Sequence, residues 1–184
     1  MDSIYHRFLP LLPENAHILD AGCGSGRDAR VFIKRGYQVT AFDACIEMAA
    51  FAEKEIGQPV HVQCFQELEY ENQFDGIWAC ASLLHVPSRE LNDVFQRLAR
   101  ALKPNGVIYC SFKYGRGEHD RGGRRFTDMD EIELRKLIGQ VDGVDVKALW
   151  VSGDCVSNRE VNWLNLILVG DKHIDAENQV FSGS

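Results

Sequence analysis

The sequence predicts an α/β protein built on one doubly wound sheet, and three observations indicate that fold class. Short apolar runs alternate with longer amphipathic runs along the chain, a pattern typical of strands alternating with helices. A glycine-rich turn directly follows the first apolar run, as expected where a buried parallel strand ends in a tight loop. The last two apolar runs are close enough in sequence to pair as antiparallel neighbours at a sheet edge.

The first half of the chain predicts three strands and two helices. Residues 16–21 are almost continuously apolar and end at a glycine, which indicates a strand buried on both faces. A helix should follow over 27–35, because Gly36 is a typical helix stop. The second strand is expected over 37–43, the second helix over 44–56 and a short third strand over 61–65.

The second half of the chain predicts four further strands and two helices. After a fourth strand over 74–81, Pro87 and Ser88 begin a helix with apolar residues at helical spacing on one face (Leu91, Val94, Phe95, Leu98 and Leu102). Thr127 should cap a second helix that ends at Leu137, with Asp130 completing a loose capping box. The remaining strands are expected over 107–112, 144–151 and 163–169.

The two ends of the chain flank this predicted sheet. Tyr5, Phe8 and Leu11 recur at spacing three, so this helical face should pack on the sheet or serve as a short lid. At the other end, residues 171–184 are predicted to form a loosely held polar tail. The folded part is therefore expected to be one domain over residues 1–170.

Composition narrows the class of protein. With 184 residues, 45% of them hydrophobic and 26% charged, the chain should bury a core of ordinary size. No apolar run approaches the roughly 20 residues that span a bilayer, and the N-terminus lacks a basic start followed by an apolar stretch. We expect a cytoplasmic protein. Six widely spaced cysteines without a CxxC pair favour buried thiols over a zinc site, so no metal is expected.

The turn after the first strand has the composition of a ligand loop. Asp20-Ala21-Gly22-Cys23-Gly24-Ser25-Gly26 lies where open α/β sheets bind ligands, beyond the carboxyl ends of their strands. Arg27 stands where a dinucleotide fingerprint needs its third glycine or alanine, which disfavours a nicotinamide cofactor. Asp43 ends the second strand at the interval where a carboxylate can bind both ribose hydroxyls. Together these residues suggest an adenosine-type cofactor.

Four segments carry a resemblance to a known family. They are ILDAGCGSGRDA at 18–29, VTAFDAC at 39–45, FDGIWACASLLHVP at 74–87 and LKPNGVIYCSF at 102–112. In this order and spacing they resemble the class I S-adenosylmethionine-dependent methyltransferases, specifically the small bacterial kind that includes tellurite-resistance-like and ubiquinone-biosynthesis-like enzymes. The resemblance implies a Rossmann-like seven-stranded sheet in the order 3-2-1-4-5-7-6, with strand 7 antiparallel and helices on both faces.

The resemblance also implies a cofactor, S-adenosyl-L-methionine, with S-adenosyl-L-homocysteine as product. Gly22 and Gly24 would lie under its methionine part and Asp43 would bind its ribose. Gln66 stands where the family often has an acid beside adenine. The full set of residues expected to bind the cofactor is Asp20, Gly22, Cys23, Gly24, Asp43, Ala44, Phe65, Gln66, Cys80 and Ala81. Asp20 has two interpretations, since it could reach the cofactor's ammonium group or accept hydrogen bonds from turn N–H groups.

Transfer of a methyl group to a protonated acceptor is helped by a base, and His85 is the candidate. It follows the fourth strand at the ligand edge, where an imidazole could take a proton near neutral pH. The alternative is a structural histidine that hydrogen-bonds to backbone at the start of a helix.

The segment after the fifth strand is a candidate acceptor site. Residues 113–125 hold five basic and two acidic side chains in a chain whose net charge is -7. Arginine binds carboxylate or phosphate bidentately, so a small anionic acceptor is one hypothesis and a solvated charged loop the other. The candidate substrate-binding residues are Tyr114, Arg116, Arg121, Arg124 and Arg125.

Two other functions are alternatives to small-molecule methyl transfer. A noncatalytic S-adenosylmethionine-binding module that regulates or scaffolds a partner would use the same pocket. Methylation of RNA or protein is less well supported, because one short basic segment in an acidic chain leaves little surface for a nucleic-acid backbone. The oligomeric state is left open by the sequence.

Overall fold

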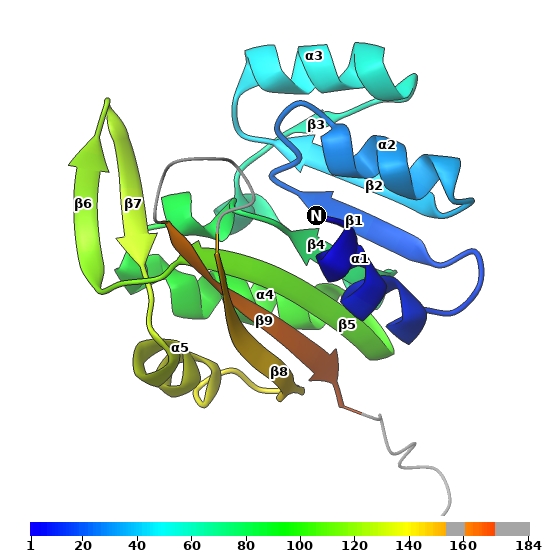
Figure 1. The fold of residues 1–184 in the computed structure, drawn as a ribbon. Helices are drawn as coiled ribbons and strands as arrows, with labels where there is room; N and C mark the ends of the chain where they lie inside the picture. The colour runs from blue at the N-terminus through cyan, green and yellow to red at the C-terminus, as the bar shows by residue number, and fades with distance from the viewer. Residues whose placement is uncertain (154–160, 172–184) are drawn as a thin grey trace, which may run out of the picture.

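A seven-stranded sheet in the order β3-β2-β1-β4-β5-β9-β8 forms the centre of the computed structural model, which describes residues 1–153 and 161–171 (Figure 1). The strands of this sheet are β1 (His17–Ala21), β2 (Gln38–Asp43), β3 (His61–Val62), β4 (Phe74–Ala79), β5 (Leu102–Lys113), β8 (Val144–Gly153) and β9 (Asn162–Gly170). Only β9 runs antiparallel to its two neighbours. The predicted fold class, strand order and antiparallel strand are therefore confirmed.

Helices cover both faces of the sheet. They are α1 (Asp2–Phe8), α2 (Arg27–Lys34), α3 (Ile46–Ile56), α4 (Leu91–Ala101) and α5 (Glu131–Ile138), with short 3-10 turns η1 (Leu9–Leu11), η2 (Phe65–Glu67), η3 (Leu83–His85) and η4 (Ser88–Glu90). In Figure 1, α1 lies in front of the sheet and α4 lies behind β5. No helix of the described residues is long and apolar enough to cross a membrane.

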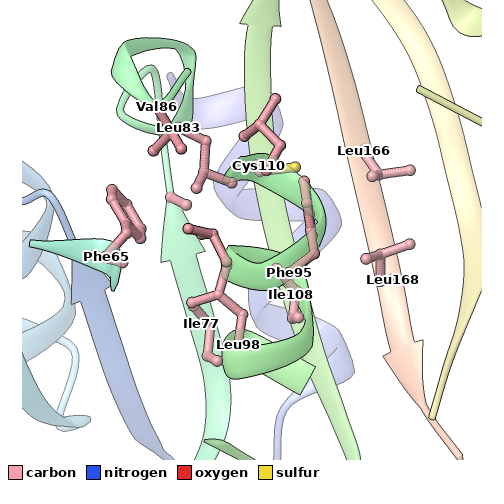
Figure 2. Packing of buried hydrophobic residues seen from close by; sticks show 14 of the residues in the cluster. Phe65, Ile77, Leu83, Val86, Phe95, Leu98, Ile108, Cys110, Leu166 and Leu168 are labelled. Atoms are coloured by element: carbon pink, nitrogen blue, oxygen red, sulfur yellow. The ribbon is translucent and has the colours of Figure 1, made fainter. Parts of the chain in front are cut away.

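The side-chain alternation of the central strands divides the apolar core in two. On one face, Ile77 of β4 and Ile108 of β5 pack with Phe95 and Leu98 of α4, as Figure 2 shows. On the other face, Trp78 and Tyr109 pack with residues of α1 and α2. Successive residues of β4 and β5 thus serve opposite cores, which is why the runs 76–79 and 107–110 are apolar on both faces.

Helix α1 is part of the core and does not project as a lid. Tyr5 and Phe8 are buried, with their ring centroids 5.3 Å and 5.2 Å from that of Trp78. Aromatic rings at this separation contribute both buried apolar area and favourable ring geometry. Of the two interpretations of the N-terminal stripe, packing on the sheet is therefore the one observed.

The structure corrects three predicted elements. The segment expected to be a loop over 113–125 instead carries a hairpin of β6 (Gly117–Arg121) and β7 (Arg124–Asp128), which stands apart from the main sheet in Figure 1. Thr127 belongs to β7, and Asp130 alone caps α5, accepting N–H groups of Ile132 and Glu133. The third strand is only two residues long, because the chain turns into η2 at Phe65.

The remaining element boundaries agree with the sequence prediction to within a few residues. Strands β5 and β8 are longer than expected, since β5 already begins at Leu102 and β8 continues to Gly153. The predicted polar tail lies outside the described residues except for Asp171, and the division into one domain and a tail stays a prediction.

Candidate functional site

A cavity of about 630 Å³ opens at the carboxyl ends of β1, β2 and β4. Strand order reverses between β1 and β4, because the chain from β1 proceeds to β2 and β3 on one side and returns to β4 on the other. Open α/β sheets bind ligands at such a reversal. The volume is within the range of small-molecule and cofactor sites.

All ten residues predicted to bind the cofactor lie at this cavity. Those that line it are Asp20, Gly22, Cys23, Gly24, Asp43, Ala44, Phe65, Gln66, Cys80 and Ala81. They come from the ends of β1 and β2 and from the segments that follow β1, β2, β3 and β4. The topology thus brings together residues that are up to 61 positions apart in the chain.

The glycine turn keeps its backbone close to neighbouring loops. Gly22, Gly24 and Gly26 all have positive φ angles, of 72°, 54° and 75°. A Cβ on Gly22 would lie 2.6 Å from Cβ of Ser82, and one on Gly26 would lie 3.0 Å from Cγ2 of Ile56. Both backbone conformation and space therefore require glycine at these two positions.

Asp43 connects the glycine turn to the loop after β2. Its Oδ2 accepts the N–H of Gly24 at 2.8 Å and its Oδ1 accepts the N–H of Cys45 at 2.9 Å. A carboxylate can accept about four hydrogen bonds, so each oxygen retains capacity for one more donor. The side chain is partly exposed at the cavity, and this arrangement suits the two hydroxyls of a ribose.

Asp20 is buried beneath the turn, with 2% of its surface exposed. Its Oδ2 accepts the N–H of Ala29 at 2.9 Å, so one of its two predicted roles, binding a backbone N–H, is observed. Burial and the nearby charge of Asp28 raise the pKa of Asp20 well above its ordinary value. Burial likewise raises the pKa of Cys23 to about 12, which makes this thiol a poor nucleophile at neutral pH.

The loop after β3 provides the far side of the cavity. The ring of Phe65 meets that of Phe42 edge to face, with centroids 5.1 Å apart. Nε2 of Gln66 donates to Oε2 of Glu90 at 2.8 Å. Because the amide nitrogen is engaged there, the carbonyl oxygen of Gln66 is the atom left to accept a hydrogen bond from a ligand.

The end of β4 is held against β1 and β5 by two serines. Oγ of Ser82 donates to the carbonyl oxygen of Ala21 at 2.7 Å, and the N–H of Ala81 donates to Oγ of Ser111 at 2.9 Å. Ala81 has a φ of 52°, which is rare outside glycine. Burial raises the pKa of the neighbouring Cys80 thiol to about 12.

His85 lies at the mouth of the same cavity. Its Nδ1 is 2.9 Å from the carbonyl oxygen of Arg125. Since a carbonyl oxygen can only accept, Nδ1 carries the proton in this contact and Nε2 of the neutral ring keeps its lone pair. The predicted structural role, a hydrogen bond to backbone, thus leaves one ring nitrogen available as a base.

The five predicted substrate residues separate into two groups. Arg124 and Arg125 of β7 line the cavity, whereas Tyr114, Arg116 and Arg121 are not among its lining residues. The Tyr114 hydroxyl donates to Glu131 at 3.0 Å, and Arg116 pairs with Asp130, so both side chains serve the start of α5. Arg121 pairs with Arg124 in the hairpin register and is exposed.

Comparisons with known proteins show what this chain is similar to. Residues 18–106 match the family model described as Methyltransferase domain. A solved structure of 1,6-didemethyltoxoflavin-N1-methyltransferase from Burkholderia thailandensis, with bound 1,6-didemethyltoxoflavin and S-adenosylhomocysteine, superposes with a TM-score of 0.77; it is 22% identical, and the match covers 92% of this chain and 76% of that chain. The family model matches a little less than half of this chain, and the solved structure shows the same fold as this chain.

Curated relatives of this chain resemble it over only part of their length. The Bacillus subtilis protein YqeM, named as a methyltransferase, is 30% identical over 65% of this chain and 52% of its own. Malonyl-[acyl-carrier protein] O-methyltransferase of Enterobacter lignolyticus is 36% identical over 50% of this chain and 37% of its own. The chain therefore spans about half or less of the length of these relatives.

Part of this cavity was not predicted from the sequence. Arg27, Asp28 and Met48 also line it, and the sequence analysis used Arg27 only to disfavour a dinucleotide. A signal was present, because a basic and an acidic residue occupy the first two positions of α2, directly after the glycine turn. The sequence did not indicate that Met48 lines the cavity, since α3 carries several apolar residues at helical spacing and none is distinguished from the others.

Proposed function

We propose that this protein transfers a methyl group from S-adenosylmethionine to a small molecule that carries an acidic group. The observation that supports the proposal is the continuity of one cavity: it is lined at one end by the glycine turn and Asp43, and at the other by His85, Arg124 and Arg125. Both reactants of a methyl transfer would then meet within one cavity.

The chain's residues fit this cofactor by their chemistry. Asp43 would accept hydrogen bonds from the ribose hydroxyls and Gln66 would accept one from the adenine amino group. Gly22 and Gly24, lacking side chains, would let the methionine part approach the backbone closely. Bound S-adenosylmethionine would supply the methyl group, carried on a positively charged sulfur. The protein itself would mainly orient the acceptor, because an in-line displacement depends on alignment more than on reactive side chains.

An anionic acceptor is favoured by the two arginines of the hairpin. Arg124 and Arg125 are adjacent on β7, and both reach the cavity beside His85. Guanidinium groups bind carboxylates and phosphates bidentately. One curated relative is named for a malonyl group, which carries a carboxylate. His85 Nε2 would take a proton from a hydroxyl or amine acceptor, and it would not be required where the carboxylate itself is methylated.

Titration calorimetry tests the cofactor. We expect binding of S-adenosylmethionine and S-adenosylhomocysteine to the full chain, no binding of NADH, and a loss of at least about tenfold in affinity on Asp43→Ala. The substitution Glu47→Ala, on the exposed surface of α3 just beyond this loop, is the matched control. Unchanged affinity in Asp43→Ala would contradict the proposed site.

Turnover tests the acceptor. The protein is incubated with S-adenosylmethionine and pairs of small acids and their neutral amides, and the formation of S-adenosylhomocysteine is measured. We expect the acids to be preferred and the preference to vanish in Arg124→Ala/Arg125→Ala, but not in Arg121→Ala, which changes an arginine outside the cavity. Tight cofactor binding without turnover of any acceptor would favour the noncatalytic module instead.

A further inference from the structure

Arg27 forms part of the cavity wall at the first residue of α2, directly after the glycine turn. Its guanidinium is held by the next residue: Nε lies 2.8 Å from Oδ1 of Asp28 and Nη2 lies 3.1 Å from Oδ2. The Arg27 side chain is 58% exposed, whereas that of Asp28 is 8% exposed. An arginine is thus presented to the cavity by a buried carboxylate behind it.

Asp28 is fixed by two further donors from distant elements. The Tyr5 hydroxyl of α1 donates to Oδ1 at 2.6 Å, and Nε1 of Trp78 in β4 donates to Oδ2 at 2.8 Å. With two bonds to each oxygen, the carboxylate uses its full accepting capacity and cannot rotate without losing contacts. The orientation of Arg27 is therefore set by helix α1 and strand β4 as well as by its own helix.

The guanidinium still has donors to offer a ligand. Two of its three nitrogens contact Asp28, and Nη1 has no hydrogen-bond partner among the described residues. A guanidinium carries five N–H donors in a planar fork that matches the geometry of a carboxylate. The free edge of Arg27 consequently suits a second, external carboxylate in the cavity.

We propose that Arg27 binds the carboxylate at the amino-acid end of the cofactor, and that Asp28 and Tyr5 are positioning residues for it. The inference rests on the proposed function, which lays the methionine part of the cofactor along the glycine turn that Arg27 follows. The methyl acceptor could also carry a carboxylate. We expect that carboxylate to bind Arg124 and Arg125, which come from β7 at the His85 end of the cavity.

Two ligands that differ in the amino-acid end test this site without any turnover. S-Adenosylhomocysteine carries the carboxylate, and 5′-deoxy-5′-methylthioadenosine retains the adenosine and sulfur but lacks it. In calorimetry without acceptor, we expect Arg27→Ala to weaken the first ligand by about 10- to 100-fold and the second by less than about twofold. Arg30→Ala, also on α2 but paired with Glu55 outside the cavity, should change neither.

Two further variants guard against a folding defect and test the positioning role. Arg27→Lys keeps a positive charge beside Asp28, so the fold should be retained. A single ammonium group cannot make two parallel hydrogen bonds to Asp28 and also two to a ligand carboxylate. This variant should therefore weaken S-adenosylhomocysteine about as much as Arg27→Ala does. Tyr5→Phe should weaken S-adenosylhomocysteine about threefold and leave methylthioadenosine unchanged.

The outcomes distinguish a failure of the carboxylate site at Arg27 from a failure of the proposed function. Equal losses for both ligands, or no loss for either, in the Arg27 variants would overturn the carboxylate site while leaving the proposed function intact. If the unaltered protein binds neither S-adenosylmethionine nor S-adenosylhomocysteine, the proposed function itself fails. An effect of Arg27→Lys on acceptor turnover alone, with cofactor affinity unchanged, would assign Arg27 to the acceptor and also overturn the inference.

Discussion

Nδ1 of His85 lies 2.9 Å from the carbonyl oxygen of Arg125, and this contact joins the loop after β4 to the β6–β7 hairpin. The ring also meets Phe126 edge to face, with centroids 4.9 Å apart. The hydrogen bond selects the tautomer whose Nε2 can accept a proton. A histidine that is structural by its contacts is therefore also prepared to act as a base.

Replacing His85 with asparagine should separate these two roles. The asparagine amide can still donate to the Arg125 carbonyl, but it has no basic nitrogen. We expect kcat with hydroxyl or amine acceptors to fall about 100-fold, kcat with carboxylate acceptors to stay within about twofold, and affinity for S-adenosylhomocysteine to be unchanged. Equal losses for all acceptors, measured as S-adenosylhomocysteine formation, would show that His85 only shapes the site.

Gly22→Ala should damage both stability and cofactor binding. The new Cβ would meet Ser82 at 2.6 Å on a backbone with a φ of 72°, so the loops after β1 and β4 must move apart. We expect the free energy of unfolding, measured in urea, to fall by about 3 kcal/mol. Gly36→Ala is the control, because its φ is also positive but its Cβ would meet nothing within 4 Å, and it should cost about 1 kcal/mol. Similar losses for both would contradict the steric explanation.

The sequence predicted the sheet well because its strands are locally distinct. β1 and β4 are mostly apolar and end at alanine, so their existence and order followed from pattern and resemblance. The hairpin was missed because β6 reads Gly-Glu-His-Asp-Arg, all of it exposed, and has no apolar alternation to identify a strand. Gly122 and Gly123 form its turn, both at positive φ.

The parts of the candidate site that lie at strand ends could be predicted from the sequence. The parts that depend on side-chain contacts between residues far apart in the chain could not. Motif spacing located the glycine turn and Asp43, since both follow strand ends directly. The network of Tyr5, Asp28 and Trp78 joins residues up to 73 positions apart through side chains, and no local pattern specifies such contacts. Tyr114 and Arg116 looked equivalent to Arg124 and Arg125, and only the fold assigns them to α5.

Asp20 predicts a pH dependence of stability that opposes the usual behaviour of carboxylates. Burial raises the pKa of Asp20 in the folded protein, so the folded state holds a proton that the unfolded chain releases. Its favourable contribution is full below the ordinary carboxyl pKa and is lost as the pH rises through the elevated pKa. Asp20→Asn should therefore unfold at higher urea concentration than the parent at about pH 8, with the difference shrinking as the pH approaches about 4.

The same substitution should weaken the cofactor. A bound ammonium group of the methionine part would favour the ionised form of Asp20, and an amide cannot ionise to supply that charge. We expect Asp20→Asn to lower affinity for S-adenosylhomocysteine about tenfold while stabilising the free protein at neutral pH. Stabilisation without any loss of affinity would assign Asp20 to the Ala29 N–H alone.

From the contacts of Glu118 we predict that the β6–β7 hairpin can detach from the cavity while cofactor binding is retained. Its Oε1 accepts the N–H of Ser88 at 2.6 Å, and the neighbouring Thr127 hydroxyl donates to the carbonyl oxygen of Val86 at 2.9 Å. Glu118→Ala removes the first contact. We expect the KM for an acidic acceptor to rise about tenfold, affinity for S-adenosylhomocysteine to stay within about twofold, and trypsin to cleave faster after Arg121, Arg124 and Arg125.

The contact should also respond to pH in a defined direction. The N–H of Ser88 lowers the pKa of Glu118. The contribution of Glu118 to hairpin docking is therefore complete above the ordinary glutamate pKa and is lost as the pH falls through the lowered value. Asp120→Ala, which removes only the exposed 3.5 Å contact with Arg125, is the control and should leave the acceptor KM within about twofold. Hairpin cleavage that is equally fast in both variants would show that the strand pairing, and not Glu118, holds β7 at the cavity.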